Sequence, residues 1–148
     1  MSDLKGTYAL VLKLDRPSTI TVGKLGTCSF SSGYYLYVGS ALGGIRLRVR
    51  RHVRGGKRLH WHIDYLREVA AVIEVWYLAS TARLECRWYR AAAGMNGAQV
   101  PVAGFGSSEC RCTSHLLYFA AMPSFERFQR QLDDAGIGLT RAAPEDFR

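Results

Sequence analysis

The chain has 148 residues, of which 48% are hydrophobic and only four are proline. This composition is typical of one globular domain with a sizeable core, and it excludes disordered, collagen-like and low-complexity chains. The uninterrupted apolar stretches are too short to span a bilayer and no signal-peptide core follows the first residues, so we expect a cytoplasmic protein that does not enter a membrane.

The net charge of +8 is concentrated in one segment of the chain. Seven basic residues and no acidic residue lie between positions 46 and 58, whereas the remainder has 13 basic and 12 acidic residues. The seven are Arg46, Arg48, Arg50, Arg51, Arg54, Lys57 and Arg58. A local positive field suits a polyanion such as nucleic acid. A basic helix that simply faces solvent is the alternative interpretation.

The first third of the chain predicts a run of strands. Residues 6–14 are rich in β-forming side chains, and residues 19–22 and 27–30 are predicted to form a hairpin around a glycine-containing break. A further strand, aromatic and β-branched, covers residues 34–38 and stops at Gly39. Residues 42–54 fit strand and helix periodicities equally, and we favour a helix because glycine pairs flank it.

The remaining elements alternate between helices and short strands. The pattern predicts a helix at 61–69, a buried strand at 71–78, a helix capped by Ser80 or Thr81 and reaching Gly94, an irregular loop at 96–108, a strand at 116–119 and a helix at 125–135 capped by Ser124. This order predicts a single α+β domain over residues 1–148, a mostly antiparallel sheet flanked by helices. Its core covers about residues 4–120, and a C-terminal helix follows at about 124–136.

Two tripeptides carry a family resemblance. Gly6-Thr7-Tyr8 opens the first strand, and Tyr37-Val38-Gly39 leads into the basic helix with Arg48-Val49-Arg50-Arg51-His52. Together with a carboxylate on a later helix they resemble the GIY-YIG nuclease superfamily. The strings at 33–41, 59–66 and 104–112 are similar to its Uri-type endonuclease branch. The resemblance covers about residues 4–120 and implies a metal-dependent endonuclease that acts on DNA.

Hydrolysis of a phosphodiester bond needs an attacking water, a base and positive charge near the phosphate. By the resemblance, Tyr8 and Tyr37 lie on adjacent strands and face one pocket, one as proton acceptor and the other positioning the water or the phosphate. The family's key arginine precedes a basic-histidine pair by one helical turn, which selects Arg48 as the transition-state residue. The remaining basic residues of the segment, together with His52, are expected to bind the nucleic-acid backbone.

Glu85, on the helix after the 71–78 strand, is the candidate ligand of Mg²⁺ or Mn²⁺, as the resemblance implies. Glu68 and Glu74 are weaker alternatives. His62 is the candidate base or leaving-group acid, with His60 as the second choice. Asp64 could orient a histidine or cap the helix at 61–69, and we favour the cap.

Four cysteines without an export signal predict free thiols rather than a disulfide framework. Cys110, Cys112 and His115 are zinc-ligand types, and a fourth ligand would come from Cys86 or a distant histidine. Their spacing is not a standard zinc motif, and a packed or surface loop is the competing interpretation.

The chain departs from the superfamily pattern in two places. Thr7 replaces the middle isoleucine, and the 29-residue interval from Tyr8 to Tyr37 is lengthened by the hairpin at 19–30. Two other functions therefore stay open: a non-catalytic nucleic-acid-binding module on a nuclease fold, and a structural zinc protein. No base-reading motif is present, although Trp61 and Trp88 are candidates for stacking on a base.

Overall fold

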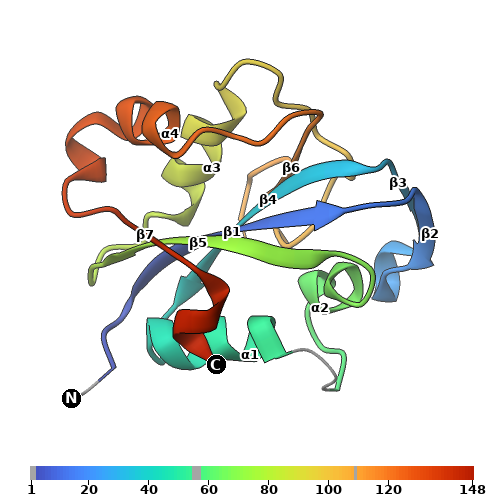
Figure 1. Cartoon of the computed structure of the whole chain (residues 1–148), viewed down its shortest axis with the longest axis horizontal. Helices are drawn as coiled ribbons and strands as arrows, with labels where there is room; N and C mark the ends of the chain where they lie inside the picture. The colour runs from blue at the N-terminus through green and yellow to red at the C-terminus, as the bar shows by residue number, and fades with distance from the viewer. Residues whose placement is uncertain (1–2, 55–57, 109) are drawn as a thin grey trace.

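A five-stranded sheet forms the centre of the computed structural model, which describes residues 3–54, 58–108 and 110–148 (Figure 1). Its strand order is β6-β4-β1-β5-β7, and each neighbouring pair is antiparallel. The strands are β1 (Gly6–Leu14), β4 (Gly33–Ala41), β5 (Ala71–Ala79), β6 (Leu116–Phe119) and β7 (Thr140–Ala142). A separate hairpin, β2 (Ser18–Thr21) and β3 (Thr27–Phe30), encloses a 3₁₀ turn at Gly23–Leu25.

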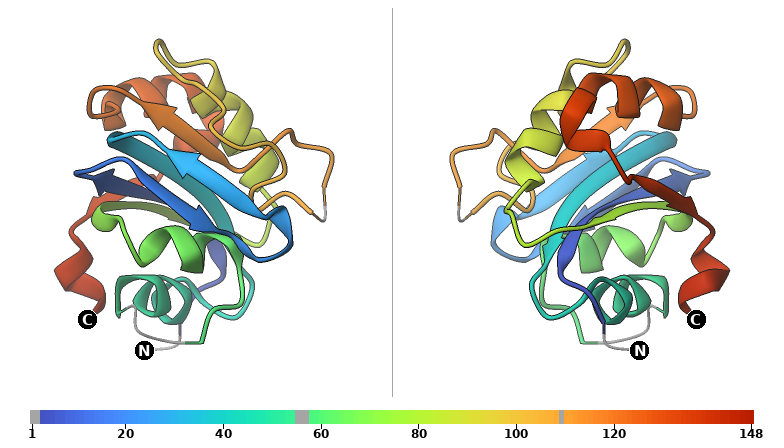
Figure 2. Two further views of the ribbon diagram at one scale, coloured as in Figure 1. Left: turned by 90° about the vertical axis from the view of Figure 1, so that its right-hand side faces the viewer. Right: turned by 90° about the vertical axis from the view of Figure 1, so that its left-hand side faces the viewer.

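Helices cover both faces of this sheet (Figure 2). α1 (Ile45–Arg54) and α2 (His62–Arg67) lie on one face, and α3 (Glu85–Ala93) and α4 (Phe125–Leu132) lie on the other. The alternation of β1 explains the two layers, because Tyr8 and Leu10 join the core beneath α1 and α2 while Ala9 and Val11 join the core beneath α3 and α4. The predicted α+β class is confirmed.

Strand β4 runs past the position where the sequence pattern placed its end. Gly39 was expected to stop the strand, but β4 continues to Ala41 because Gly39 pairs with Tyr8 of β1. A Cβ atom at position 39 would lie 2.5 Å from the Tyr8 hydroxyl oxygen. Any larger residue at position 39 would therefore clash with the Tyr8 side chain, which lies across Gly39.

Helix α1, where the periodicity was ambiguous, is capped from outside the predicted segment. Its first turn has no acidic residue, and the carboxylate of Asp3 accepts the backbone N–H groups of Arg46 and Leu47 at 3.0 and 2.9 Å. The carboxylate satisfies two donors that the helix leaves free at its N-terminus and opposes the positive end of its dipole. The glycines expected to end this helix, Gly55 and Gly56, lie outside the described residues.

The cap predictions for α3 and α4 had different outcomes. Ser124 caps α4 as expected, since its hydroxyl accepts the Arg127 N–H, but the α-helix ends at Leu132 because Asp133 adopts a φ of 53°. The Ser80 cap was wrong, because this hydroxyl accepts the N–H of Ala82 in a local turn and α3 begins only at Glu85.

The C-terminal residues contain structure that the pattern did not predict. β7 pairs with the edge of β5, and a 3₁₀ turn at Pro144–Phe147 then places the Phe147 ring 5.9 Å from that of Tyr77. Three residues are too few to show a strand period, so only the pairing with β5 identifies β7. No helix of the described chain has the length and apolar character needed to cross a membrane.

Asp64 fixes the junction between α1 and α2. Its carboxylate accepts two hydrogen bonds from the Arg51 guanidinium, at 2.7 and 2.9 Å, and the backbone N–H groups of His60 and Trp61, both at 2.8 Å. The expected capping role is confirmed, and the ion pair with Arg51 adds to it. Burial alone would raise the pKa of Asp64, but the hydrogen bonds from Arg51 and the two N–H groups together lower it.

Replacing Asp64 by alanine should lower the free energy of unfolding by about 2–4 kcal/mol at pH 7, because four donors lose a partly buried charged acceptor. Since the folded-state pKa is depressed, the difference from wild type should shrink as the pH falls below about 4. Urea denaturation at several pH values measures both effects. Asp15→Ala is the control, because the carboxylate of Asp15 is 82% exposed and should show little change; an equal loss in both variants would contradict the assignment.

Candidate active site

One pocket is lined by side chains that the sequence analysis proposed as catalytic or metal-binding. It has a volume of about 410 Å³ and is lined by Tyr8 from β1, Tyr37 from β4, Arg48 from α1, His62 from α2 and Glu85 from α3. The other residues that line it are Gly39, Ser40, Leu42, His60, Trp61, Arg83, Gly106, Ser108, Cys110 and His115. The pocket lies beside the end of β4 that extends beyond its pairing with β6.

The two tyrosines are buried neighbours within the pocket wall. Their ring centroids are 6.4 Å apart, and the Tyr8 hydroxyl lies 2.8 Å from Nε2 of His52. His52 was expected to contact nucleic acid on the basic surface, but only 2% of it is exposed. That placement was wrong, because the Tyr8 hydroxyl holds the ring of His52 in the core; the residue supports Tyr8 instead.

The environment keeps both phenols and the imidazole neutral. Burial, with the Tyr37 hydroxyl as a second cause, raises the pKa of Tyr8 well above its usual value despite the opposing Arg48 charge. Burial also raises the pKa of Tyr37, and Glu85 adds to that shift. Burial lowers the pKa of His52 to about 3. A free tyrosinate is therefore not available as a base. The Tyr8 oxygen can accept a proton only if the Tyr8 hydroxyl gives its own proton to a neighbouring group at the same time.

Arg48 presents a positive charge to the pocket. Its guanidinium donates to the Ser40 carbonyl at 3.2 Å and lies 4.3 Å from the centre of the Trp61 ring. Among the described residues no carboxylate lies within ion-pair distance of it. The charge is thus held in place by a carbonyl and an aromatic ring and stays available to an anion.

His62 is oriented by the loop that precedes β6. Its Nδ1 accepts the backbone N–H of Gly106 at 2.8 Å, so the proton of the neutral ring lies on Nε2. Burial lowers the pKa of His62, which favours this neutral form. The ring therefore acts as a hydrogen-bond donor toward the pocket, and the role of base is disfavoured. His60 also lines the pocket and is exposed.

Among the three glutamates considered from the sequence, only Glu85 lines the pocket. It is the first residue of α3 and is partly exposed. Glu74 pairs with Arg141 and accepts the indole N–H of Trp76, and Glu68 is exposed at the end of α2. A single accessible carboxylate fits Mg²⁺ or Mn²⁺, which bind oxygen and retain much of their water.

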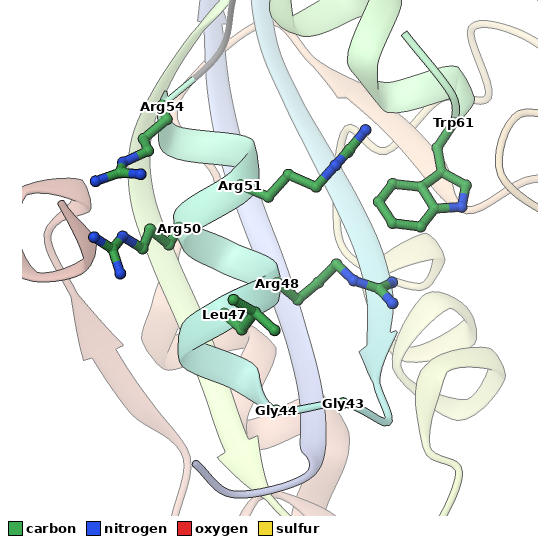
Figure 3. Close-up of a pocket in the computed structure, with 8 residues that line it drawn as sticks. All are labelled: Gly43, Gly44, Leu47, Arg48, Arg50, Arg51, Arg54 and Trp61. Carbon is green, nitrogen blue, oxygen red and sulfur yellow. The ribbon is translucent and has the colours of Figure 1, made fainter. Parts of the chain in front are cut away.

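A second pocket of about 440 Å³ continues from the first along α1 (Figure 3). Its lining consists of Gly43, Gly44, Leu47, Arg48, Arg50, Arg51, Arg54 and Trp61, so Arg48 and Trp61 belong to both pockets. The Arg48 and Arg51 side chains extend toward the Trp61 ring, with their Cζ atoms 4.3 and 4.2 Å from its centre. We call this surface the arginine groove.

The remaining basic residues and the two tryptophans named from the sequence differ in their exposure and in whether they line a pocket. Arg46 and Arg58 are exposed outside the arginine groove, and Lys57 lies outside the described residues. Trp88, a candidate for stacking on a base, is fully buried and cannot do so, because α3 and α4 enclose it. Trp61 is partly exposed between the two pockets and keeps that possibility.

A cluster of sulfur and nitrogen ligands adjoins the first pocket. Cys86, Cys110, Cys112 and His115 each offer a ligand atom, and these four atoms lie within 4.8 Å of one another. The sequence left the fourth ligand open, and the start of α3 supplies it as Cys86. All four cysteines are free thiols, as expected, and Cys28 lies apart in β3. The described chain therefore holds a group that could bind a metal ion.

A family model covers most of the chain. Residues 7–136 match the family described as domain of unknown function DUF123, and the chain belongs to this family. Comparisons with curated proteins and with solved structures give no match.

Gly106 couples the loop to the pocket, because it adopts a φ of +72° and a Cβ there would lie 2.9 Å from Cε1 of Tyr37. Gly106→Ala should therefore lower the free energy of unfolding by about 1–3 kcal/mol more than Gly104→Ala does. Gly104 is a matched control, with a φ of +79° but its nearest neighbour at 3.6 Å. Urea denaturation gives the comparison, and equal losses would show that Gly106 is not pressed against Tyr37.

Proposed function

We propose that the chain is a metal-dependent endonuclease that hydrolyses phosphodiester bonds in DNA, and that it belongs to the Uri-type branch of the GIY-YIG superfamily. The observation that carries the proposal is the convergence of Tyr8, Tyr37, Arg48, His62 and Glu85 on one pocket. These residues come from five elements that are separated in sequence, so packing alone gives no reason for so many polar groups at one place.

Arg48 and His62 would bind the scissile phosphate. The Arg48 guanidinium, which has no carboxylate partner among the described residues, would grip two phosphate oxygens and stabilise the negative charge that grows in the transition state. The Nε2–H of His62 donates a further hydrogen bond to the same group. Glu85 would hold the divalent ion, and Mg²⁺ or Mn²⁺ bound there supplies positive charge to the phosphate and lowers the pKa of water.

Tyr8 and His52 together would take the proton from the attacking water. As the water oxygen bonds to phosphorus, its proton passes to the Tyr8 oxygen and the Tyr8 proton passes to Nε2 of His52 across 2.8 Å. The phosphorus–oxygen bond to the leaving sugar breaks, and that oxygen takes a proton from solvent. Tyr37 positions the water or the phosphate beside Tyr8. The relay avoids a free tyrosinate, which the buried site disfavours.

The arginine groove would hold the DNA strand on one side of the scissile bond. It shares Arg48 and Trp61 with the catalytic pocket. A single DNA backbone that crossed both would place its scissile phosphate in the pocket and neighbouring phosphates in the groove. The groove presents guanidinium groups, which bind phosphates without reading base identity.

Cleavage assays test the catalytic roles. With labelled duplex, single-stranded, flapped and branched DNA and with Mg²⁺ or Mn²⁺, Arg48→Ala, Glu85→Ala and Tyr8→Phe should each slow cutting by at least about 100-fold. Binding should survive in Glu85→Ala, because this change removes a metal ligand and no phosphate contact. Arg130→Ala and Glu68→Gln are the controls, since both side chains are exposed outside the pocket, and their rates should match wild type.

The outcome also separates the proposal from a binding module. If no substrate is cut under any metal condition while DNA is bound with a steep salt dependence, the chain is a non-catalytic recognition domain. Arg46→Ala removes the same charge from α1 at an exposed position outside the pocket. If it slows cutting as much as Arg48→Ala does, the loss of rate reflects only the lower positive charge of the helix, and the role assigned to Arg48 is wrong.

Binding as a function of salt tests the arginine groove. Replacing Arg50 and Arg54 together by alanine should flatten the slope of log Kd against log salt by about two, one for each lost phosphate contact. Arg130→Ala is the control, because this exposed residue lies on α4 across the sheet. Fluorescence anisotropy with a labelled duplex measures the slope, and an unchanged slope in the double variant would remove the groove from the DNA path.

A further inference from the structure

We propose that Cys86, Cys110, Cys112 and His115 bind a structural zinc ion that fixes the wall of the catalytic pocket. Three sulfurs and one imidazole form a common closed ligand set for zinc, and soft thiolates favour zinc over the magnesium or manganese proposed for Glu85. The ion would therefore be a second metal, separate from the one in the reaction.

The separations between ligand atoms suit a tetrahedral ion. At tetrahedral angles, Zn–S bonds of about 2.3 Å and Zn–N bonds of about 2.0 Å require S···N edges of about 3.5 Å and S···S edges of about 3.8 Å. Nε2 of His115 lies 3.3 Å from Sγ of Cys110 and 3.8 Å from Sγ of Cys86. All four ligand atoms lie within 4.8 Å of one another, so small side-chain rotations bring them to one centre.

The surroundings favour a closed site over a loose group of thiols. His115 is 3% exposed and the three cysteines are partly buried. Among the described residues, no other group of three or more such ligands is drawn together in this way. With four protein ligands the ion has no open position for water or substrate, which assigns it a structural role.

The ion would hold a long irregular segment in place. Between Gly94 and His115 the described residues contain only an isolated bridge of Gln99 with Tyr118, and the segment loops past the edge of the sheet (Figure 2). A segment of this length without regular structure needs tertiary constraints, and the ion would tie it to α3 through Cys86. His115 is itself anchored, because its carbonyl accepts the N–H of Val38.

The zinc site would also position catalytic groups. Glu85 precedes Cys86 on α3, and Cys110 and His115 line the same pocket as Glu85. Gly106, within the tied segment, donates to His62. Loss of the ion would therefore displace both Glu85 and His62. This consequence for cutting rests on the proposed nuclease function, whereas the zinc site itself does not.

Metal analysis tests the site without any activity assay. Protein expressed with zinc in the medium and passed through a desalting column should contain one zinc ion per chain by mass spectrometry. Cys112→Ser and His115→Ala should lower zinc affinity by at least about 100-fold, measured by competition with a chromogenic chelator. Cys28→Ser is the matched control, because this thiol lies in β3 and donates to the Gly26 carbonyl, and it should retain full zinc content.

Cobalt substitution keeps the test informative if the ligand variants do not fold. Wild-type protein refolded with Co²⁺ should show the strong visible absorption of a tetrahedral thiolate site, and Cys110→His should keep the metal with weaker sulfur-to-cobalt absorption. Wild type that neither carries zinc nor binds Co²⁺, or a disulfide among Cys86, Cys110 and Cys112, would overturn the proposal. Loss of metal from Cys28→Ser would overturn the ligand assignment. If the chain contains zinc but cuts no DNA, the zinc site is supported and only the proposed nuclease function is contradicted.

Discussion

The register between β1 and β4 is the constraint on which the site depends. It places Tyr8 opposite Gly39, and the missing side chain at Gly39 leaves the space that the Tyr8 hydroxyl occupies. From there the hydroxyl reaches His52 on α1, which fixes how that helix lies on the sheet. A shift by one residue would send Tyr8 to the opposite face of the sheet, among the residues beneath α3 and α4.

The buried polar groups around this register carry a cost. Nε2 of His52 lies beside the Tyr8 hydroxyl, whereas the buried Nδ1 of His52 and the buried Thr7 hydroxyl find no hydrogen-bond partner in the part of the chain that the structure describes. An unsatisfied buried group destabilises a fold by about 1–3 kcal/mol. In the proposed relay, His52 holds its extra proton only transiently: its low pKa favours return of that proton to the Tyr8 oxygen as Tyr8 releases to solvent the proton it took from the attacking water.

The two faces of the sheet contribute differently to the candidate site. Beneath α1, His52 is buried against Tyr8, which lines the pocket, and the arginine groove opens along the same helix. Beneath α3 and α4, Trp76, Trp88 and Phe128 pack together, with the ring centroids of Trp76 and Trp88 5.2 and 5.4 Å from that of Phe128. The N-terminus of α3 connects the faces, because it brings Glu85 to the pocket and Cys86 to the ligand cluster.

Local pattern was enough to predict most of the framework, because a strand or an amphipathic helix is a property of neighbouring residues. β1, β3 and β6 follow the predicted bounds. Arg48 and Glu85 were selected by the family resemblance, and both line one pocket. The tertiary structure alone decided the burial of His52, the choice of Cys86 as fourth ligand, the neutral tautomer of His62 and the short strand β7. Each of these features depends on a contact with a residue distant in the sequence. The periodicity of neighbouring residues cannot predict which distant group will bury a side chain or form a hydrogen bond with it.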